Sequence, residues 1–371
     1  MLPYTGDYTE HIDPEKPSLT FYSFTPRPLM RGDMYQMDDE LAALLTEAHR
    51  NIGFLEGLVT YAPNKEAFAE LMLLKECTYS HMIDYDAPDF KEVLTIRGTG
   101  KGDITPITNL EMAYKAAKSM EVAAPDLSRI CGIALNGDPE NNSIDVRDYQ
   151  TFWLGVKTNL KGYNPTAPDA VLPALADISA YLYNDHNTDP LIKAALVHYQ
   201  FEMIHPFERY NGIVGRIIVP MVLRDTIGEA MPLICLSEYL YHNKNEYFDL
   251  LRTTQYSGGY IRWIKFFVCA VGEAAKQSAK LLAQYENDIL WAEQQIKENT
   301  LSSKSIWGVY NYLKRYPVSS ISRATEQTRF SFNSISKAMQ SLKETGIVQE
   351  TAAVRNRIWV HKKLIENLWY F

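Results

Sequence analysis

Apolar residues recur along most of the chain with the spacing of an amphipathic helix, and this pattern limits the fold more than any other feature. One predicted helix, between residues 41 and 58, takes its apolar stripe from Leu41, Leu44, Leu45, Ala48 and Ile52. A second runs from Phe68 towards Ile83. Alternation of the strand type is scarce. We therefore predict a mainly α-helical fold.

The clearest helix begins at Asp189-Pro190, a pair that supplies an N-cap and a proline in the first turn. Its apolar face is expected to contain Ile192, Ala195, Leu196, Tyr199 and Met203. Further helices are predicted at about 110–121, 171–184, 244–254 and 260–297.

The composition excludes several classes of protein. With 371 residues, 46% of them hydrophobic and 22% charged, the chain is typical of a soluble protein with two or three domains. A net charge of −8 argues against a polycation wrapped around nucleic acid. The four cysteines are far apart and form no CxxC pair, which excludes a disulfide framework and favours a reducing compartment.

The N-terminus lacks the basic start and apolar run of a signal peptide. No apolar stretch approaches the roughly 18 residues that a membrane span needs. We expect a cytoplasmic protein with no membrane partner. The sequence leaves open whether it acts alone or as a homodimer.

Shifts in composition and charge predict three domains. Residues 1–100 begin with an extended arm over 1–30, which is rich in proline and aromatic residues, and continue as helices. Residues 101–300 form the central domain, interrupted by a loop or hairpin over 154–169. Residues 301–371 form the third domain, because six Lys and five Arg there face only four Glu, a net charge of +7.

Within 301–371 we predict three helices followed by a hairpin, with the helices at 306–313, 319–328 and 333–345 and the strands at 347–350 and 357–360. This order is typical of a winged helix-turn-helix, whose third helix enters a DNA groove. The residues able to contact phosphate or base edges there are Arg329, Asn333 and Lys337. Winged helices also dock proteins, so both partners stay open.

The stretch from His205 to Arg216, HPFERYNGIVGR, carries the clearest chemistry. A histidine ends one helix and an Asn-Gly turn opens the next, so an imidazole lies beside free backbone N–H groups, a natural anion site. With Arg216 one turn further on, phosphate is the expected ligand. A base beside a phosphate cradle indicates phosphoryl or nucleotidyl transfer to a hydroxyl. The alternative is a histidine that only caps or packs a helix.

This stretch resembles the signature of the Fic family, H-x-F-x-[D/E]-G-N-G-R-x-x-R. The preceding helix, the segments 149–155 and 162–168, the N-terminal arm and the C-terminal winged helix extend the resemblance to nearly the whole chain. It implies a Fic-type helical bundle with a short β-hairpin flap at 160–168, which would align a target segment, and a C-terminal winged helix-turn-helix. Residues 101–300 would then be the Fic domain.

Fic proteins mostly transfer AMP from ATP to a Ser, Thr or Tyr hydroxyl of a target protein, with magnesium. By resemblance, His205 is the general base and Phe207 is the buried aromatic that anchors the loop. The expected nucleotide- and phosphate-binding residues are Asn211, Gly212, Gly215 and Arg216, the last of these on the γ-phosphate.

Three positions depart from the family signature. Arg209 replaces the acid that binds magnesium, so we name no metal ligand in this chain and expect magnesium binding to be impaired. Tyr210 replaces the first glycine, where a positive φ would strain a tyrosine. Ile213 replaces the first arginine. Two lost phosphate anchors would lower ATP affinity by about 10²–10⁴. Glu208 is acidic but one place early.

The family's inhibitory helix, (S/T)-x-x-x-E-(G/N), resembles the stretch from Ser80 to Tyr85. Asp84 replaces its glutamate and is one methylene shorter. Asp84 therefore either blocks Arg216, as the family glutamate does, or only caps its helix and faces solvent.

Two functions follow from these residues. The first is a protein adenylyltransferase that modifies a Ser, Thr or Tyr hydroxyl, with activity weakened or abolished by the divergent loop. The alternative is a catalytically degenerate Fic scaffold that regulates through DNA or protein binding by residues 301–371.

Overall fold

A computed structural model describes residues 5–12, 21–31, 34–140, 143–151, 164–299, 303–351 and 357–369. Its helices are α1 (Asp39–Tyr61), α2 (Lys65–Asp84), α3 (Phe90–Thr99), α4 (Thr105–Ala117), α5 (Ala124–Asn136), α6 (Pro168–Asn184), α7 (Pro190–Ile204), α8 (Asn211–Ile227), α9 (Leu236–His242), α10 (Lys244–Ser257), α11 (Tyr260–Glu298), α12 (Lys304–Arg315), α13 (Ile321–Gln327), α14 (Phe332–Glu344) and α15 (Lys362–Trp369), with 3₁₀ turns η2 (Leu29–Arg31) and η3 (Gly228–Leu233). Its strands are β1 (Gly6–His11), β2 (Phe21–Pro26), β3 (Val318–Ser320), β4 (Val348–Glu350) and β5 (Ile358–His361). The mainly helical prediction is confirmed.

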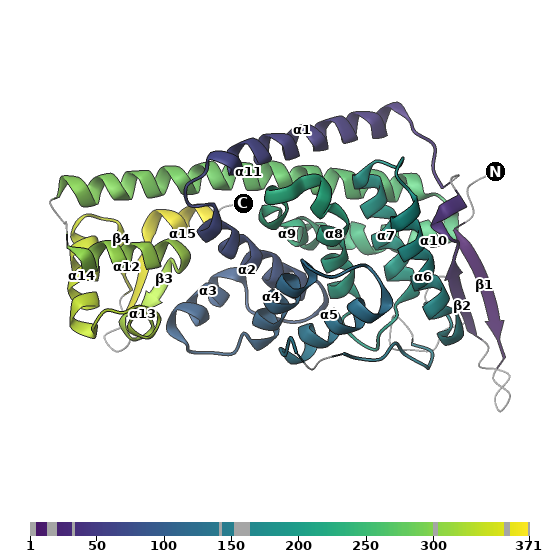
Figure 1. The fold of residues 1–371 in the computed structure, drawn as a ribbon, viewed down its shortest axis with the longest axis horizontal. Coiled ribbons are helices and arrows are strands. Elements are labelled where there is room, and N and C mark those ends of the chain that lie inside the picture. Colours follow the sequence, from purple (N-terminus) through teal and green to yellow (C-terminus); the bar gives the residue numbers. More distant parts are fainter. Residues whose placement is uncertain are drawn as a thin grey trace.

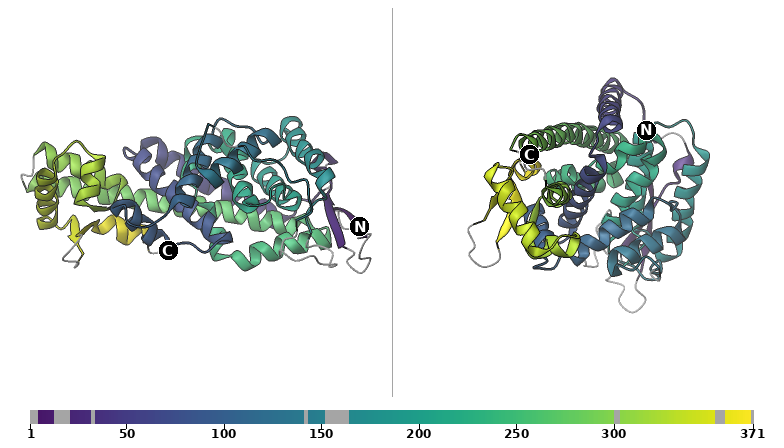
Figure 2. Two further views of the ribbon diagram at one scale, coloured as in Figure 1. Left: turned by 90° about the horizontal axis from the view of Figure 1, so that it is seen from below. Right: turned by 60° about the vertical axis from the view of Figure 1, so that its left-hand side comes forward.

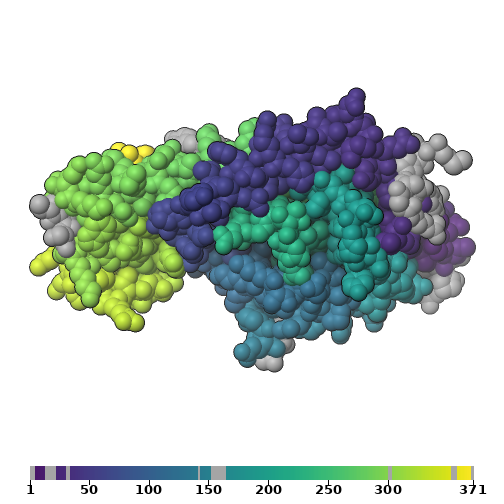
Figure 3. Space-filling model, turned by 45° about the horizontal axis from the view of Figure 1, so that its top comes forward, coloured from purple at the N-terminus to yellow at the C-terminus, as the bar shows by residue number. Residues whose placement is uncertain are grey.

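The other helices are arranged around the long helices α1 and α11 and the buried helix α7 (Figure 1). α1 lies along α11, and Figure 3 shows its outer surface as a ridge across one face of the molecule. α7 packs between α6, α8 and α11. Every residue of α7 from Leu191 to Ile204 except Lys193 is buried, as expected for a helix without a polar face. α7 therefore forms the centre of the core from which the site is built.

The N-terminal arm differs from the prediction of one extended segment. β1 and β2 pair antiparallel, with Gly6 opposite Pro26 and His11 opposite Phe21. The Phe24 side chain of β2 is fully buried, and β2 packs on α6 and α7. The aromatic residues of the arm thus anchor a hairpin at one end of the molecule.

The C-terminal segment lies at the opposite end of the long axis (Figure 2). Helices α12, α13 and α14 and the β4–β5 pair correspond to the predicted elements. The structure adds helix α15 after β5 and a third strand, β3, in the order β3-β5-β4. The segment has its own hydrophobic core, which includes Ala292 and Ile296 at the end of α11. Val318 and Leu364 pack instead into the core of the main body. The winged helix-turn-helix and the three-domain division stay predictions.

Two arrangements position the site. α7 and α8 pack against each other and are joined by the short loop of residues 205–210, while the C-terminal end of α2 approaches the first turns of α8. No helix in the described part of the chain combines the length and apolar composition that a membrane crossing needs.

Gly98 allows α3 to approach β3, and this contact can be tested by adding one methyl group. A Cβ at Gly98 would lie 1.9 Å from the carbonyl oxygen of Val318. We therefore expect Gly98→Ala to lower the free energy of unfolding by about 1–3 kcal/mol, measured by urea denaturation. Gly53→Ala is the matched control, because no atom lies within 4 Å of a Cβ at that helical position. The free energy of unfolding of this control should rise by about 0.5–1 kcal/mol. Equal effects of the two variants would contradict the close approach.

Candidate functional site

His205 lies at the junction between α7 and the loop. It is the C-cap of α7 with φ 52°, and its N–H donates to the Phe201 carbonyl at 2.9 Å. Its ring hydrogen-bonds to the backbone of Glu202. Burial, reinforced by the nearby Arg147 cation, lowers the pKa of His205 to about 4. The imidazole is therefore neutral at pH 7 and keeps one ring nitrogen with a lone pair, as a general base requires.

The buried guanidinium of Arg147 holds this junction in place. Its Nε donates to the His205 carbonyl at 2.8 Å, and its Nη2 donates to the carbonyls of Ile204 (3.1 Å) and Thr166. Its Nη1 donates to the Tyr149 carbonyl at 3.0 Å. Burial lowers the pKa of Arg147 to about 10, so the cation persists at neutral pH. Its charge and donors satisfy the C-terminal carbonyls of α7 and complement the helix dipole there.

The loop after His205 is closed by Asn211. The side-chain amide of Asn211 accepts from the Phe207 N–H at 2.8 Å and donates to the Phe207 carbonyl at 2.7 Å. Phe207 itself is fully buried. The side chain of Asn211 is therefore engaged by the loop, which leaves the backbone N–H groups at the start of α8 to face an anion. Tyr210, the N-cap of α8, has φ 64°, the strained state expected from the sequence.

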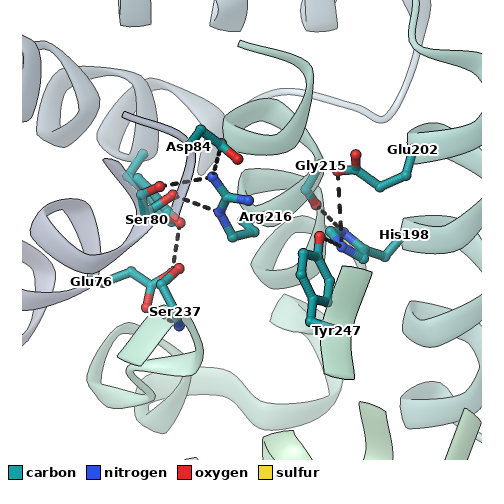
Figure 4. A network of polar contacts seen from close by, with 10 residues as sticks. Glu76, Ser80, Asp84, His198, Glu202, Gly215, Arg216, Ser237 and Tyr247 are labelled. Atoms are coloured by element: carbon teal, nitrogen blue, oxygen red, sulfur yellow. Dashed lines mark hydrogen bonds and ion pairs between the residues drawn. The ribbon is translucent and has the colours of Figure 1, made fainter. Parts of the chain in front are cut away.

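Arg216 on α8 is 1% exposed and is held by the C-terminal end of α2 (Figure 4). Its Nε donates to Ser80 Oγ at 2.8 Å, and its Nη2 donates to the Ser80 carbonyl at 2.8 Å and to Asp84 Oδ2 at 2.5 Å. Burial works against the charge, but the Asp84 carboxylate outweighs it and raises the pKa of Arg216. Of the two alternatives for Asp84, the structure contains the contact with Arg216.

Two residues that depart from the family patterns meet beside this ion pair. The rings of Tyr85, at the end of α2, and Tyr210, in the loop, pack edge to face with centroids 5.2 Å apart. His81 lies against both rings. The end of α2 and the loop are thus joined by an aromatic contact as well as by the Asp84–Arg216 pair.

A cleft of about 1130 Å³ opens between these elements. His205, Gly212, Arg216 and Asp84 line one side of it. The start of α11 and helix α10 line the other side, with the cations Lys244, Arg252 and Arg262 among them. The cleft thus combines a neutral base, a helix N-terminus and a guanidinium, a set suited to a phosphate ester.

The structure places the remaining predicted residues outside this cleft. Gly215 does not line the cleft, and its carbonyl oxygen lies 2.8 Å from His198 Nδ1. Of the substituted positions, Ile213 is fully buried, and Arg209 is exposed, as is Glu208 beside it. None of these lines the cleft.

The flap and the nucleic-acid candidates lie apart from the cleft. Residues 160–163 of the predicted flap are outside the described residues. At its other end, the side chains of Asn164 and Thr166 donate to β2 carbonyls at 2.7 and 2.9 Å. The DNA-binding candidates Arg329, Asn333 and Lys337 are all exposed, in or just before α14.

Sequence reasoning missed two residues of this site. Arg147 lies 58 positions before His205, and nothing in its local sequence indicates the contact. Glu202 lines the cleft with its carboxyl buried, and it lies one helical turn before His205. That i, i+3 spacing was the available signal.

Comparison with known proteins agrees with this geometry. Residues 130–223, which contain α7, the loop and most of α8, match the Fic/DOC family. This stretch is a Fic/DOC family domain. The fold of the chain is similar to that of a Fic family protein from Desulfovibrio desulfuricans G20, with a TM-score of 0.55 and 15% identity over 88% of this chain and 98% of that one.

Two curated relatives of the Fic domain are named as adenylyltransferases. The chain is 38% identical over 64 residues to protein adenylyltransferase fic-1 of Caenorhabditis briggsae, a match that covers 16% of this chain and 12% of that protein. It is 28% identical over 119 residues to a probable protein adenylyltransferase of Aquifex aeolicus, covering 29% and 34% of the two chains. The match therefore spans between about one eighth and one third of the relatives' length.

The role of Arg147 in holding the Fic domain loop can be tested by stability. Arg147→Met removes the donors to four carbonyl groups, so we expect the free energy of unfolding to fall by about 3 kcal/mol. Arg129→Met is the matched control, because this arginine is exposed and, among the described residues, donates only to the Pro139 carbonyl at 3.3 Å. This control should lower the free energy of unfolding by less than about 0.5 kcal/mol. Chemical denaturation measures both variants. Equal losses would contradict a stabilising role of the four Arg147 hydrogen bonds.

Proposed function

We propose that the chain transfers AMP from ATP to a Ser, Thr or Tyr hydroxyl of a target protein, with His205 as general base. The observation that carries this proposal is the neutral imidazole of His205 in the same cleft as Gly212 and Arg216. The adenylyltransferase names of the two relatives agree with it.

The proposed step needs one base and one anion site. The target hydroxyl oxygen attacks the α-phosphorus of ATP and forms the new P–O bond, the bond to pyrophosphate breaks, and the hydroxyl proton passes to His205. The N-terminal N–H groups of α8 stabilise charge on the phosphate oxygens. Arg216 is proposed to bind the end of the phosphate chain.

Asp84 and Ser80 are proposed to restrain this reaction. The Nη2 and Nε donors of Arg216 are occupied by the end of α2, so a phosphate has to displace Asp84 before it receives them. This restraint on Arg216 comes from α2, because no other described carboxylate forms an ion pair with Arg216.

Magnesium accompanies this chemistry in the Fic family, but the residues of this cleft do not fit it. The position of the metal-binding acid holds Arg209, which is exposed and outside the cleft, as is Glu208. Asp84 is held by Arg216, and Glu202 is deeply buried. Among the described residues no group of three His, Cys, Asp or Glu could hold a metal. The proposed transfer therefore includes no metal step.

Transfer can be measured with ATP labelled at the α-phosphate, incubated with the protein and a cell lysate. His205→Ala should lower the label by about 10²-fold or more, because the general base is lost. Asp84→Ala should raise it, because the guanidinium is released, whereas Asp86→Ala, a nearby exposed carboxylate, should leave it unchanged. Since the neutral imidazole is the base, the rate should rise as pH passes the His205 pKa of about 4 and be level at neutral pH.

Label that survives His205→Ala would remove His205 from the mechanism. A variant with the family loop, Arg209→Asp, Tyr210→Gly and Ile213→Arg, gives the complementary comparison. If only this variant transfers label, the natural chain is the degenerate scaffold.

The alternative is a regulator that binds DNA through residues 301–371. The observation that favours it is the exposed face of α14, where Asn333 and Lys337 lie one turn apart and Arg329 precedes the helix. The net charge of +7 over this segment adds a favourable field for phosphate.

DNA binding can be measured by mobility shift with genomic fragments at two salt concentrations. Arg329→Glu combined with Lys337→Glu should abolish the shift, because both side chains are proposed to contact phosphate or bases. Lys91→Glu, one charge reversal of the same kind on the exposed surface of α3, is the control and should retain the shift. A shift that resists the double substitution would exclude α14 as the DNA contact.

A further inference from the structure

Glu202 is a buried carboxyl of the cleft to which the proposed reaction assigns no role. It lies on α7 one turn before His205, is 5% exposed and lines the same cleft. No hydrogen bond from the described residues reaches its Oε1. An ionisable neighbour, His198, has its Nε2 atom 4.0 Å from Oε1.

His198 does not supply a positive charge to Glu202. Its Nδ1 lies 2.8 Å from the Gly215 carbonyl oxygen and therefore carries the proton, and its Nε2 lies 2.9 Å from the hydroxyl of Tyr247, from which it accepts. Burial lowers the pKa of His198 to about 3. The 4.0 Å contact thus joins a carboxyl to a neutral ring.

Two other charges face Glu202, one from each neighbouring helix. Arg216 on α8 favours the carboxylate, and Asp84 on α2 disfavours it. These two groups are paired with each other at 2.5 Å, so their effects on the pKa of Glu202 largely cancel. Burial is the main influence, and it raises the pKa of Glu202 to about 8. At pH 7 the side chain is an uncharged acid with one O–H donor.

The first turns of α8 are shaped to bring this acid close. A Cβ at Gly215 would lie 2.3 Å from Glu202 Oε1, so only glycine lets the carboxyl rest against the helix backbone. One turn earlier, Gly212 lies beside Arg216 in the same way, with its Cβ position 3.0 Å from Nη1. Oε1 of Glu202 therefore rests against the α8 backbone, and Glu202 and Arg216 both line the cleft.

We propose that Glu202 is a phosphate-binding residue, which donates its carboxyl proton to an oxygen of the ligand's phosphate chain and thereby takes the place of a donor that Ile213 cannot supply. This inference rests on the proposed function for the identity of the ligand as a nucleoside polyphosphate. It gives the cleft a phosphate donor that carries no charge and needs no metal.

The inference has a definite dependence on pH. Phosphate oxygens only accept hydrogen bonds, so the acid form of Glu202 binds them and the carboxylate repels them. Affinity is therefore present below the Glu202 pKa of about 8 and is lost above it. A protein that begins as the carboxylate at pH 9 takes up a proton when phosphate binds.

Calorimetry with the full chain and ATP, in EDTA at pH 7, 8 and 9, tests the inference. The wild type should bind about tenfold more weakly at pH 9 than at pH 7, since a group with a pKa near 8 is mostly ionised there. Two buffers with different ionisation enthalpies should report an uptake approaching one proton at pH 9 and little at pH 7.

Three variants complete the experiment. Glu202→Gln keeps an N–H donor that does not titrate, so its affinity should be level from pH 7 to 9 and exceed that of the wild type at pH 9. Glu202→Ala should bind ATP more weakly than the wild type at pH 7, and its affinity should also be level from pH 7 to 9. Glu246→Gln, an exposed carboxyl of the same cleft, should retain the wild-type dependence on pH.

The outcomes separate this inference from the proposed function. A wild-type affinity that is level between pH 7 and 9, a slope that survives Glu202→Gln, or no ATP binding at pH 7 would each overturn it. Binding with the expected slope but without label transfer supports the inference and rejects the transferase. Label transfer without the expected pH dependence of ATP affinity supports the transferase and rejects the inference.

Discussion

The arrangement of the site depends on one buried cation. Arg216 is 1% exposed, and a guanidinium removed from water to that extent is tolerated only when it is paired and hydrogen-bonded. Ser80 and Asp84 meet this requirement, and both belong to the last turns of α2. The position of α2 against α8, and with it the side of the cleft that faces His205, follows from the need to compensate this charge.

The residues that depart from the family patterns form a connected set. Tyr210 in the loop and Tyr85 after α2 replace small residues, and their rings touch. A change at one position therefore alters the environment of the other. The simultaneous divergence of the loop and of the end of α2 has a direct physical reason in this contact.

Local patterns in the sequence predicted the long helices, the position of His205 at the end of α7 and the positive φ of Tyr210, because spacing and neighbouring residues determine each of these. They did not predict contacts between distant segments. The Arg147 clamp joins residues 58 positions apart. The hairpin of β1 and β2 depends on where the two strands meet and not on their composition. The reach of Asp84 was undecided, since the shorter side chain suffices only because α2 lies close to α8.

The 39-residue helix α11 has a consequence for how this protein can be divided. At an axial rise of 1.5 Å per residue it is about 58 Å long. Its first turns border the cleft at Arg262, and its last turns contribute Ala292 and Ile296 to the C-terminal core. A shortened chain that stops at the end of α11 would expose an apolar helical tail to water. Such a product is prone to aggregate, and a separately expressed Fic domain is better ended further back along the helix.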